Sequence, residues 1–298
     1  MTVRHLLEVD DLTPAELEEV LVLGRSQALH RVMEGRGAAL LFEKPSARTR
    51  HSTEMAVVQL GGHPVYVRPD EVGIDTRETA EDVACTLSQF HAAICARVFD
   101  HTVLERMAGA GNIPVVNLLS DAAHPLQAVA DLLTIAAESG LDGTTLAWVG
   151  DFSNVARSLA LASAMVGIEV RVASPEGYGP SEADLARVRA LGGTIDVAGS
   201  PAEAVAGVDA VSTDAWYSMG QEAEAAARRP LFAPYRVDAD LMAHAAPTAI
   251  FLHCLPAHRG EEVTDEVLDG PASRVWPQAA NRLHAARAVL AHLLGVRP

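Results

Sequence analysis

Short apolar runs alternate with amphipathic stretches along the whole chain. Near the N-terminus, Thr13-Pro14 is typical of a helix start, and apolar positions follow at Leu17, Val20 and Leu21. Further on, apolar runs of strand length are separated by patterns of helical period. We expect strands at Ala38–Phe42, His63–Val67, Ala93–Val98 and Pro114–Leu119, and helices at Thr53–Leu60, Glu78–Phe90, Val103–Ala108 and 121–138. This alternation predicts βαβ units around a parallel sheet.

The segment Ser139–Gly143 is rich in glycine and interrupts the pattern, so we place a domain boundary there. A second series of strands follows, and the chain closes with an amphipathic helix at Pro277–Leu294. We expect these strands at Thr145–Val149, Val170–Ala173, Thr194–Val197, Ala210–Thr213 and Ile250–Cys254. The predicted fold class is α/β, with two doubly wound parallel-sheet domains and an interdomain cleft.

Composition narrows the class of protein. The 298 residues are 49% hydrophobic and 21% charged, and acidic residues outnumber basic ones to give a net charge of −16. This charge argues against non-specific binding to nucleic acid or to an anionic membrane. We expect no transmembrane helix, because no apolar run reaches about 18 residues. The N-terminus lacks a signal-peptide pattern and three cysteines form no disulfide framework, so a cytoplasmic location is expected.

The segment Ser46-Ala47-Arg48-Thr49-Arg50 joins the first buried strand to a helical pattern. Serine is a good N-cap, and the unpaired N–H groups of a first helical turn attract anions. Residues two apart point to nearly opposite sides of a helix, so we assign Arg48 to a ligand and Arg50 to a structural ion pair. An ordinary capped helix with two solvated arginines fits the same residues.

Further polar residues come directly after predicted strands, where ligands bind to parallel sheets. Arg97 closes an apolar run, and His124-Pro125-Leu126-Gln127 opens the long helix with His124 and Gln127 on one face. At a helix start the cationic form of histidine is disfavoured, so His124 suits hydrogen-bond donation to a carbonyl. Alternatively, Arg97 is a strand-end arginine that extends to solvent, and His124 belongs to a cluster that caps the helix. Gly150–Asn154 has one glycine and fails the G-x-G-x-x-G fingerprint, so no nicotinamide or flavin cofactor is expected.

Two later loops also follow predicted strands. Asp214–Gly220 combines an acid with a flexible polar segment, which fits either a surface turn or a mobile loop over a cationic amine. His253–Gly260 contains possible metal ligands, but their spacing matches no zinc pattern, so we expect no metal. A nucleophilic Cys254 stays open. Arg282, in the final helix, also fits a solvated position.

Taken together, these residues resemble the carbamoyltransferase family, and within it the ornithine branch. The S-x-R-T-R motif corresponds to Ser46–Arg50, H-P-x-Q to His124–Gln127, D-x-W-x-S-M-G to Asp214–Gly220 and H-C-L-P to His253–Pro256. All four motifs stand in the family's order and span nearly the whole chain. The aspartate branch is similar but uses a lysine in the loop after the second strand, and Lys44 is the only lysine of this chain.

The resemblance implies transfer of a carbamoyl group from carbamoyl phosphate to the side-chain amine of L-ornithine, giving citrulline, without a cofactor. It implies domains at 1–138 with the C-terminal helix 278–298 packed back on them, and at 139–277. It implies three groups of site residues. The carbamoyl phosphate-binding residues are Ser46, Ala47, Arg48, Thr49, Arg97, His124, Gln127, Cys254, Leu255 and Arg282, and the ornithine-binding residues are Asn154, Asp214, Ser218, Met219 and Leu119. The catalytic residues are Arg97, His124, Cys254 and Arg282.

The resemblance also implies a homotrimer, or a multiple of trimers, with the site at a subunit interface. Two positions depart from the ornithine branch. Ala47 replaces the usual threonine, and Gly73 stands where a residue usually reaches the neighbouring subunit. A carbamoyltransferase for another amine and a non-catalytic anion-binding paralogue are the alternatives that the sequence leaves open.

Overall fold

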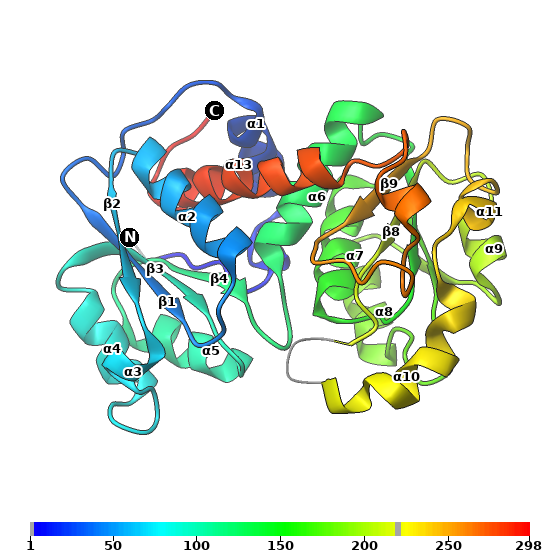
Figure 1. Cartoon of the computed structure of the whole chain (residues 1–298). Coiled ribbons are helices and arrows are strands. Elements are labelled where there is room, and N and C mark those ends of the chain that lie inside the picture. Colours follow the sequence, from blue (N-terminus) through cyan, green and yellow to red (C-terminus); the bar gives the residue numbers. More distant parts are fainter. Residues whose placement is uncertain (1–2, 218–221) are drawn as a thin grey trace. The chain divides into compact units, whose positions relative to one another are not determined.

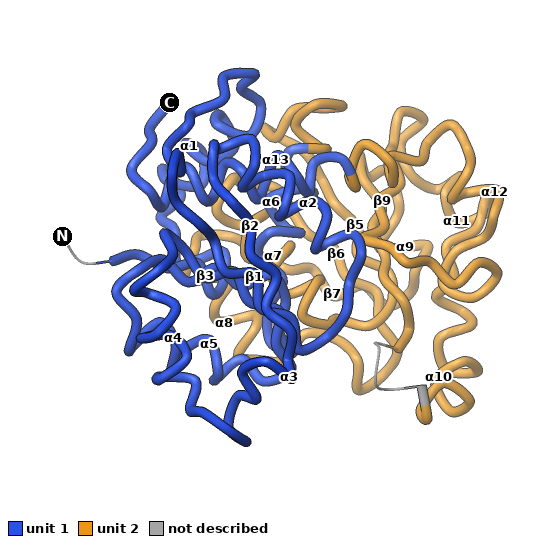
Figure 2. Tube along the Cα trace, turned by 60° about the vertical axis from the view of Figure 1, so that its left-hand side comes forward, with its two compact units in different colours: residues 1–133, 280–298 blue, residues 134–279 orange. Residues whose placement is uncertain are grey.

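The computed structural model describes residues 3–217 and 222–298 (Figure 1). The chain divides into two compact units, which Figure 2 shows in different colours. Unit 1 comprises residues 1–133 and 280–298, and unit 2 comprises residues 134–279. The boundaries differ by a few residues from those expected at 138 and 277, because the helices α6 (Pro125–Glu138) and α13 (Val275–Leu293) each run through one of them.

Unit 1 is built on a four-stranded parallel sheet in the order β2-β1-β3-β4. Its strands are β1 (Gly37–Phe42), β2 (His63–Val67), β3 (His91–Arg97) and β4 (Val115–Leu119). Its other helices are η1 (Val9–Asp11), α1 (Pro14–Arg25), α2 (Ala47–Gln59), α3 (Pro69–Val72), α4 (Ala80–Leu87) and α5 (His101–Ala110). After β1 the chain adds β2 on one side and then β3 on the other, so the winding reverses between β1 and β3.

Both faces of this sheet are covered, which explains the continuous apolar runs seen in the sequence. Alternate residues of β1, Ala39 and Leu41, pack with Ile94 of β3 against Leu104 and Met107 of α5. Their neighbours on the opposite face of β1 are equally buried. Burial of each large aliphatic side chain contributes roughly 2 kcal/mol, so this layered core stabilises the frame that carries the polar loops.

Helix α2 begins six residues before the predicted start at Thr53. Ser46 is its N-cap, and the Ser46 side chain accepts a hydrogen bond from Thr49 N. The first turn holds polar residues in place of an apolar stripe, so hydrophobic periodicity alone located only the second half of the helix. The polar start of α2 therefore lies directly after β1.

Helix α13 packs back on unit 1, as the sequence predicted (Figure 1). Arg287 is buried and donates hydrogen bonds to Ser26 O at 2.7 Å, Gly24 O at 3.4 Å and Gln59 Oε1 at 3.0 Å. These acceptors lie at the end of α1 and of α2. One buried guanidinium thus joins the last helix to two elements near the N-terminus.

Unit 2 is built on a five-stranded parallel sheet in the order β7-β6-β5-β8-β9. Its strands are β5 (Thr145–Val149), β6 (Glu169–Ala173), β7 (Ile195–Val197), β8 (Ala210–Thr213) and β9 (Ile250–His253). Its helices are α7 (Asn154–Val166), α8 (Glu182–Ala190), α9 (Pro201–Val205), η2 (Glu222–Glu224), α10 (Ala225–Phe232), η3 (Ala233–Tyr235), α11 (Ala239–Met242) and α12 (Asp265–Leu268). Here the winding reverses between β5 and β8.

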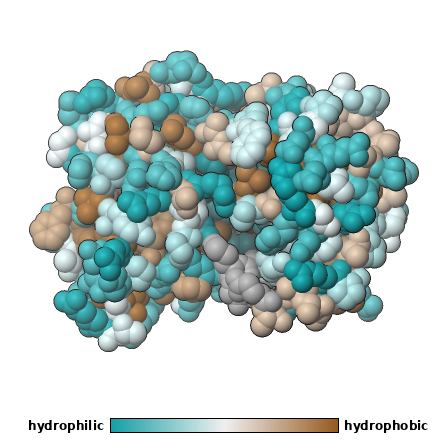
Figure 3. Space-filling view, in the orientation of Figure 1, coloured by the Kyte–Doolittle hydropathy of each residue, from teal (hydrophilic) through white to brown (hydrophobic). Residues whose placement is uncertain are grey.

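The core of unit 2 repeats the packing of unit 1. Val149 of β5, Val211 of β8 and Phe251 of β9 pack against buried residues of the covering helices, including Val205 and Val267. The two parallel sheets confirm the predicted α/β class. Among the described residues, no helix is both long and apolar enough to span a membrane. Figure 3 shows a largely hydrophilic face on which apolar patches are scattered.

Replacing Arg287 with alanine is expected to lower the free energy of unfolding by about 1–3 kcal/mol, because buried carbonyl groups of α1 lose their donor. Chemical denaturation followed by circular dichroism measures this change. Arg189→Ala, at an exposed position of α8, is the matched control and should alter stability by less than about 0.5 kcal/mol. Equal effects of the two substitutions would contradict the structural role of Arg287.

Candidate functional site

In a parallel sheet, ligands bind beyond the carboxyl ends of the strands, at the point where the winding reverses. In unit 1 this point lies between β1 and β3. Phe42 and Arg97, the last residues of these strands, are paired in the sheet register, and Glu43 N donates to Arg97 O at 2.8 Å. The topology therefore places the start of α2 and the side chain of Arg97 at the same edge of the sheet.

The first turn of α2 is arranged as an anion-binding turn. Ser46 Oγ donates to Thr49 Oγ1 at 3.1 Å and accepts from Thr49 N at 3.4 Å. The amide groups of Ala47 and Arg48 lie in the same turn, where an α-helix offers no acceptor of its own. Such a turn, with the positive end of the helix dipole, stabilises a phosphate or carboxylate.

Two arginines converge on Thr49. Arg97 Nη1 and Arg282 Nη2 each lie 3.4 Å from Thr49 Oγ1, and both arginines are buried. Arg282 belongs to α13, so the C-terminal helix delivers a positive charge to the start of α2. Two cations held this close repel each other, and an anion bound beside them would relieve the repulsion.

His124 and Gln127, at the start of α6, complete this cluster. Arg282 Nη1 lies 3.0 Å from His124 Nε2 and donates to Gln127 Oε1. A guanidinium only donates, so His124 Nε2 accepts and the neutral ring carries its proton on Nδ1. Burial and the charges of Arg282 and Arg97 hold the pKa of His124 well below its usual value. Gln127 Nε2 donates in turn to buried Asp131 at 2.7 Å.

The two arginines of the S-x-R-T-R motif, Arg48 and Arg50, lie in different surroundings. Arg50 Nε lies 2.7 Å from Glu54 Oε1 one helical turn away, and its guanidinium lies over the Tyr66 ring, 4.0 Å from the centroid. The predicted structural ion pair of Arg50 is therefore confirmed. Arg48 is exposed at the first turn of α2. Its assignment to a ligand stays a prediction.

In unit 2 the winding reverses between β5 and β8, and the two corresponding loops carry polar residues. Asp151 follows β5 and pairs with buried Arg228 at 2.8 Å, while burial raises the pKa of the Asp151 carboxyl. Arg228 also donates to Trp216 O at 3.0 Å, which joins the loop after β5 to the loop after β8. Asn154 is the first residue of α7, and its side chain accepts from Val155 N at 3.0 Å.

Asp214 and Cys254 lie side by side because of strand register. Thr213 of β8 pairs with His253 of β9, so the residues that follow each strand are neighbours. Cys254 Sγ donates to Asp214 Oδ1 at 3.1 Å, and Ala215 N donates to the same oxygen at 2.8 Å. Desolvation by burial raises the pKa of Asp214.

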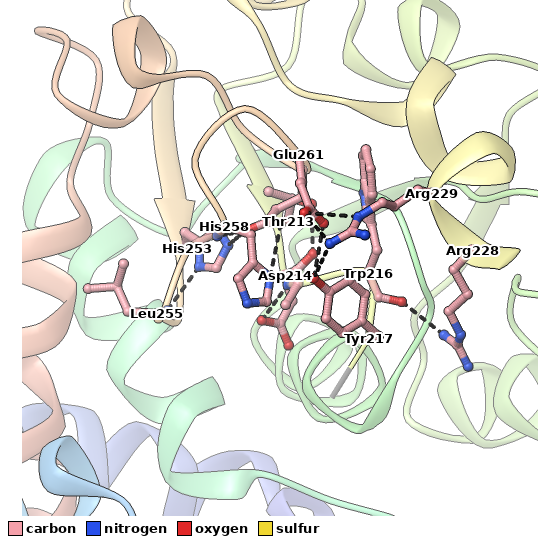
Figure 4. A network of polar contacts seen from close by, with 12 residues as sticks. Thr213, Asp214, Trp216, Tyr217, Arg228, Arg229, His253, Leu255, His258 and Glu261 are labelled. Carbon is pink, nitrogen blue, oxygen red and sulfur yellow. Dashed lines mark hydrogen bonds and ion pairs between the residues drawn. The ribbon is translucent and has the colours of Figure 1, made fainter. Parts of the chain in front are cut away.

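The loop after β8 is anchored by aromatic and charged side chains (Figure 4). Trp216 is buried against Phe232, and the ring of Tyr217 stacks on His258 with centroids 5.0 Å apart. Arg229 pairs with Glu261 at 2.9 Å and contacts the Tyr217 hydroxyl. The predicted ligands Ser218 and Met219 lie outside the described residues.

Asp214, His253 and Cys254 each offer one possible metal-binding atom, and these atoms lie within 4.8 Å of one another. However, His253 Nδ1 accepts from Leu255 N at 2.9 Å, and His253 Nε2 lies 3.2 Å from Glu262 Oε1. Both ring nitrogens of His253 are therefore already engaged. Binding of a metal ion would require one of these hydrogen bonds to break.

Two further sequence features have structural counterparts in unit 1. Leu119 ends β4, and its carbonyl accepts from Val98 N at 3.0 Å. Gly73 ends α3 with φ of +58°, a left-handed conformation that glycine adopts readily. Next to it, Asp75 is paired with Arg106 at 2.7 Å. In this chain, therefore, the loop beside Gly73 is fixed by an arginine of α5.

Both parts of the chain match one family. Residues 4–137 match the family described as "Aspartate/ornithine carbamoyltransferase, carbamoyl-P binding domain", and residues 142–293 match the corresponding "Asp/Orn binding domain". The chain belongs to the aspartate/ornithine carbamoyltransferase family. The first match contains Thr49, Arg97 and His124 of the arginine cluster. The second begins just before β5 of unit 2 and also contains Arg282.

Relatives within this family extend over the full chain. The ornithine carbamoyltransferase of Acidothermus cellulolyticus is 50% identical over 98% of this chain and 97% of its own length. That of Pyrococcus abyssi is 45% identical over 98% and 96%. Among solved structures, ornithine carbamoyltransferase from Pyrococcus furiosus matches with a TM-score of 0.94 and 44% identity, covering 99% of both chains.

Of the predicted site residues in unit 1, the structure brings six into one hydrogen-bonded cluster: Ser46, Thr49, Arg97, His124, Gln127 and Arg282. In unit 2 it links Asp214 with Cys254. Three buried residues beside these groups were missed, namely Asp131, Arg228 and Glu262. Asp131 stands four positions after Gln127 on α6, so helical spacing signals it. Arg228 meets Asp151, and Glu262 meets His253, only through the tertiary fold.

His124→Gln is expected to weaken the dependence of the unfolding free energy on pH in the acidic range. The pKa of His124 is lowered in the folded state, so its contribution is fully present above about pH 6.5 and is lost as pH falls from there toward the folded-state pKa. Glutamine can still accept from Arg282 but does not titrate. The dependence of unfolding free energy on pH should fall by up to about 1.4 kcal/mol per pH unit in this window. Identical acid limbs for both proteins would contradict a neutral buried His124.

Proposed function

We propose that this chain transfers the carbamoyl group of carbamoyl phosphate to the side-chain amine of L-ornithine, giving L-citrulline and phosphate. The observation that carries the proposal is full-length identity of 45–50% to proteins named ornithine carbamoyltransferase. The arginine cluster of unit 1 supports it, because it offers the positive groups that a phosphate dianion requires against a net charge of −16.

In this proposal, unit 1 binds carbamoyl phosphate. Ser46, Ala47 and Thr49 hold the phosphate through the first turn of α2, and Arg48 turns inward on the same oxygens. At about 4 Å and an effective dielectric constant near 20, each arginine contributes roughly 4 kcal/mol per unit of ligand charge before desolvation is subtracted. Arg97 spans the phosphate and the carbonyl, and Gln127 orients the carbamoyl group.

The reacting carbonyl oxygen gains negative charge as the amine attacks. His124 Nδ1–H, Thr49 and Arg282 are the proposed donors to this oxygen. Because Arg282 occupies His124 Nε2, the proton that His124 donates is the one on Nδ1. The carbon–nitrogen bond forms, the bond between the carbonyl carbon and the phosphate oxygen breaks, and phosphate leaves with the electron pair and takes up the proton that the amine nitrogen loses. No covalent intermediate with the protein is required, and orientation of the two reactants supplies much of the acceleration.

In this proposal, unit 2 binds ornithine. Asp214 holds the α-ammonium, and Asn154 with Ser218 and Met219 holds the carboxylate. From unit 1, Leu119 contributes through its backbone. A bound ammonium would favour the ionised form of Asp214 and so oppose the effect of burial. Cys254 and Leu255 complete the surroundings of the reacting carbonyl.

Three further properties belong to the proposal. The active form is a homotrimer or a multiple of trimers, and the protein is cytoplasmic. The cellular direction is arginine biosynthesis, which a 45% identical relative from Pyrococcus furiosus, named as the anabolic enzyme, supports. Light scattering measures the assembly.

The decisive experiment is measurement of citrulline formed from carbamoyl phosphate and ornithine by the purified chain. A parallel panel of lysine, putrescine and N-acetylornithine tests the acceptor amine. A preference for another amine would replace ornithine in the proposal. Tight binding of phosphate without any product would identify a non-catalytic paralogue.

Arg48→Ala and Asp214→Ala are expected to affect different ligands. Arg48→Ala should weaken carbamoyl phosphate binding by at least about 100-fold, since a charged contact to the phosphate is lost. Asp214→Ala should mainly raise the KM for ornithine. Arg50→Ala is the matched control, because its guanidinium pairs with Glu54 and should leave both ligands unaffected. Equal loss of both ligands in both variants would refute the assignment of one ligand to each unit.

Activity at saturating carbamoyl phosphate is expected to rise with pH. The attacking amine must be neutral, and deprotonation of an amine with a pKa near 10.4 costs roughly 3 kcal/mol at pH 8. Initial rates at fixed ornithine between about pH 6 and pH 9 measure this dependence. A flat profile over that range would show that amine deprotonation does not control the rate.

A further inference from the structure

Glu262 is a buried acid that the proposed reaction does not use. It lies in the segment between β9 and α12, and neither Glu262 nor His253 exposes more than 1% of its surface. Glu262 Oε1 accepts from His258 N and lies 3.2 Å from His253 Nε2. The carboxyl group therefore joins the end of β9 to the far end of the His253–His258 loop.

The hydrogen bonds at His253 assign its tautomer. Leu255 N can only donate, so His253 Nδ1, 2.9 Å away, accepts and carries no proton. A neutral ring then carries its proton on Nε2, which donates to Glu262 Oε1. This sequence of contacts leads from Glu262 through the imidazole to the backbone of Leu255. Figure 4 shows the bond between His253 and Leu255 at the end of the strand.

Leu255 has a backbone conformation that requires such support. Its φ is +59°, in the left-handed region that residues other than glycine rarely adopt. The conformation sets the direction of the Leu255 peptide groups and of the adjoining Cys254, whose thiol contacts Asp214. Residues held in such conformations cluster at functional sites.

We propose that Glu262 is a positioning residue: by holding His253 as the Nε2–H tautomer, it fixes the backbone of Leu255 and the neighbouring Cys254 in the orientation that the reaction uses. This inference rests on the proposed function, since it concerns how Cys254 and Leu255 are presented to the carbamoyl group. Glu262 itself contacts no reactant. The second oxygen of Glu262 lies 3.7 Å from His258 Nδ1, too far for a hydrogen bond, so the action is through Oε1.

Two substitutions at His253 separate its two hydrogen bonds. In His253→Asn, the amide oxygen takes the place of Nδ1 and can still accept from Leu255 N. In His253→Gln, the longer side chain reaches toward Glu262 and the acceptor for Leu255 N is lost. We expect the asparagine variant to retain at least about tenfold more of kcat than the glutamine variant. Equal kcat values for the two variants would overturn the proposal.

Substitutions at Glu262 test the carboxyl group directly. Glu262→Ala should lower kcat by about 100-fold, because the loop is no longer held in register with the reacting carbonyl. Glu262→Gln keeps an oxygen acceptor for His253 and His258 N and should restore kcat to within about tenfold of the unmodified chain. Glu266→Gln, at an exposed position of α12, is the control and should leave kcat unchanged.

The binding of inorganic phosphate distinguishes positioning from general damage. The arginine cluster belongs to unit 1 and Glu262 to unit 2, so the phosphate Kd, measured by calorimetry, should change by less than about twofold in Glu262→Ala while kcat falls. A parallel loss of phosphate binding and kcat would indicate a merely structural role and would overturn the proposal. So would an unchanged kcat in a folded Glu262→Ala protein. If the unmodified chain forms no citrulline, the proposed function itself fails.

Discussion

The convergence of Arg97 and Arg282 on the hydroxyl of Thr49 is the interaction on which the candidate site of unit 1 depends. It concentrates positive charge at a helix start in a chain that is strongly acidic as a whole. Burial of like charges is unfavourable in isolation, so the surrounding structure must hold them in place. The sheet fixes Arg97 at the end of β3, and α13 fixes Arg282. Both arginines are therefore held in place before any ligand arrives, which is the condition for electrostatic stabilisation of a developing charge.

Unit 2 is also built on a parallel sheet, but its loops position a different set of polar side chains. Its reversal between β5 and β8 brings the loops after these strands to one edge, and the register of β8 with β9 adds Cys254 beside Asp214. Arg228 then joins two of these loops through Asp151 and the carbonyl of Trp216. Parallel strands thus supply the coarse positions, and buried polar side chains supply the fine ones.

Much of this arrangement could be predicted from the sequence. Apolar runs and their spacing indicate a parallel sheet, and ligands bind such sheets beyond the carboxyl ends of the strands. Element bounds were less accurate where the first turn was polar, as in α2, whose capping residue Ser46 rather than its apolar stripe marks the start. The neutral state of His124 followed from its place at a helix start, but which nitrogen carries the proton depends on Arg282, 158 positions away. Likewise, no sequence pattern pointed to Glu262. Its contact with His253, nine positions away, is determined by the fold of the loop and not by a regular sequence spacing.

Unit 1 is discontinuous in sequence, since residues 280–298 return to it after the whole of unit 2. The contact between Thr49 and Arg282 joins positions that are 233 residues apart. On a ribosome that adds about 5–20 residues per second, the first 133 residues therefore wait roughly 7–30 seconds for the arginine that completes their anion-binding cluster. Until then the surface that α13 covers stays without its partner, so unit 1 completes its fold only after unit 2 has been synthesised. The helix that closes the first unit is thus made after all the strands of the second unit.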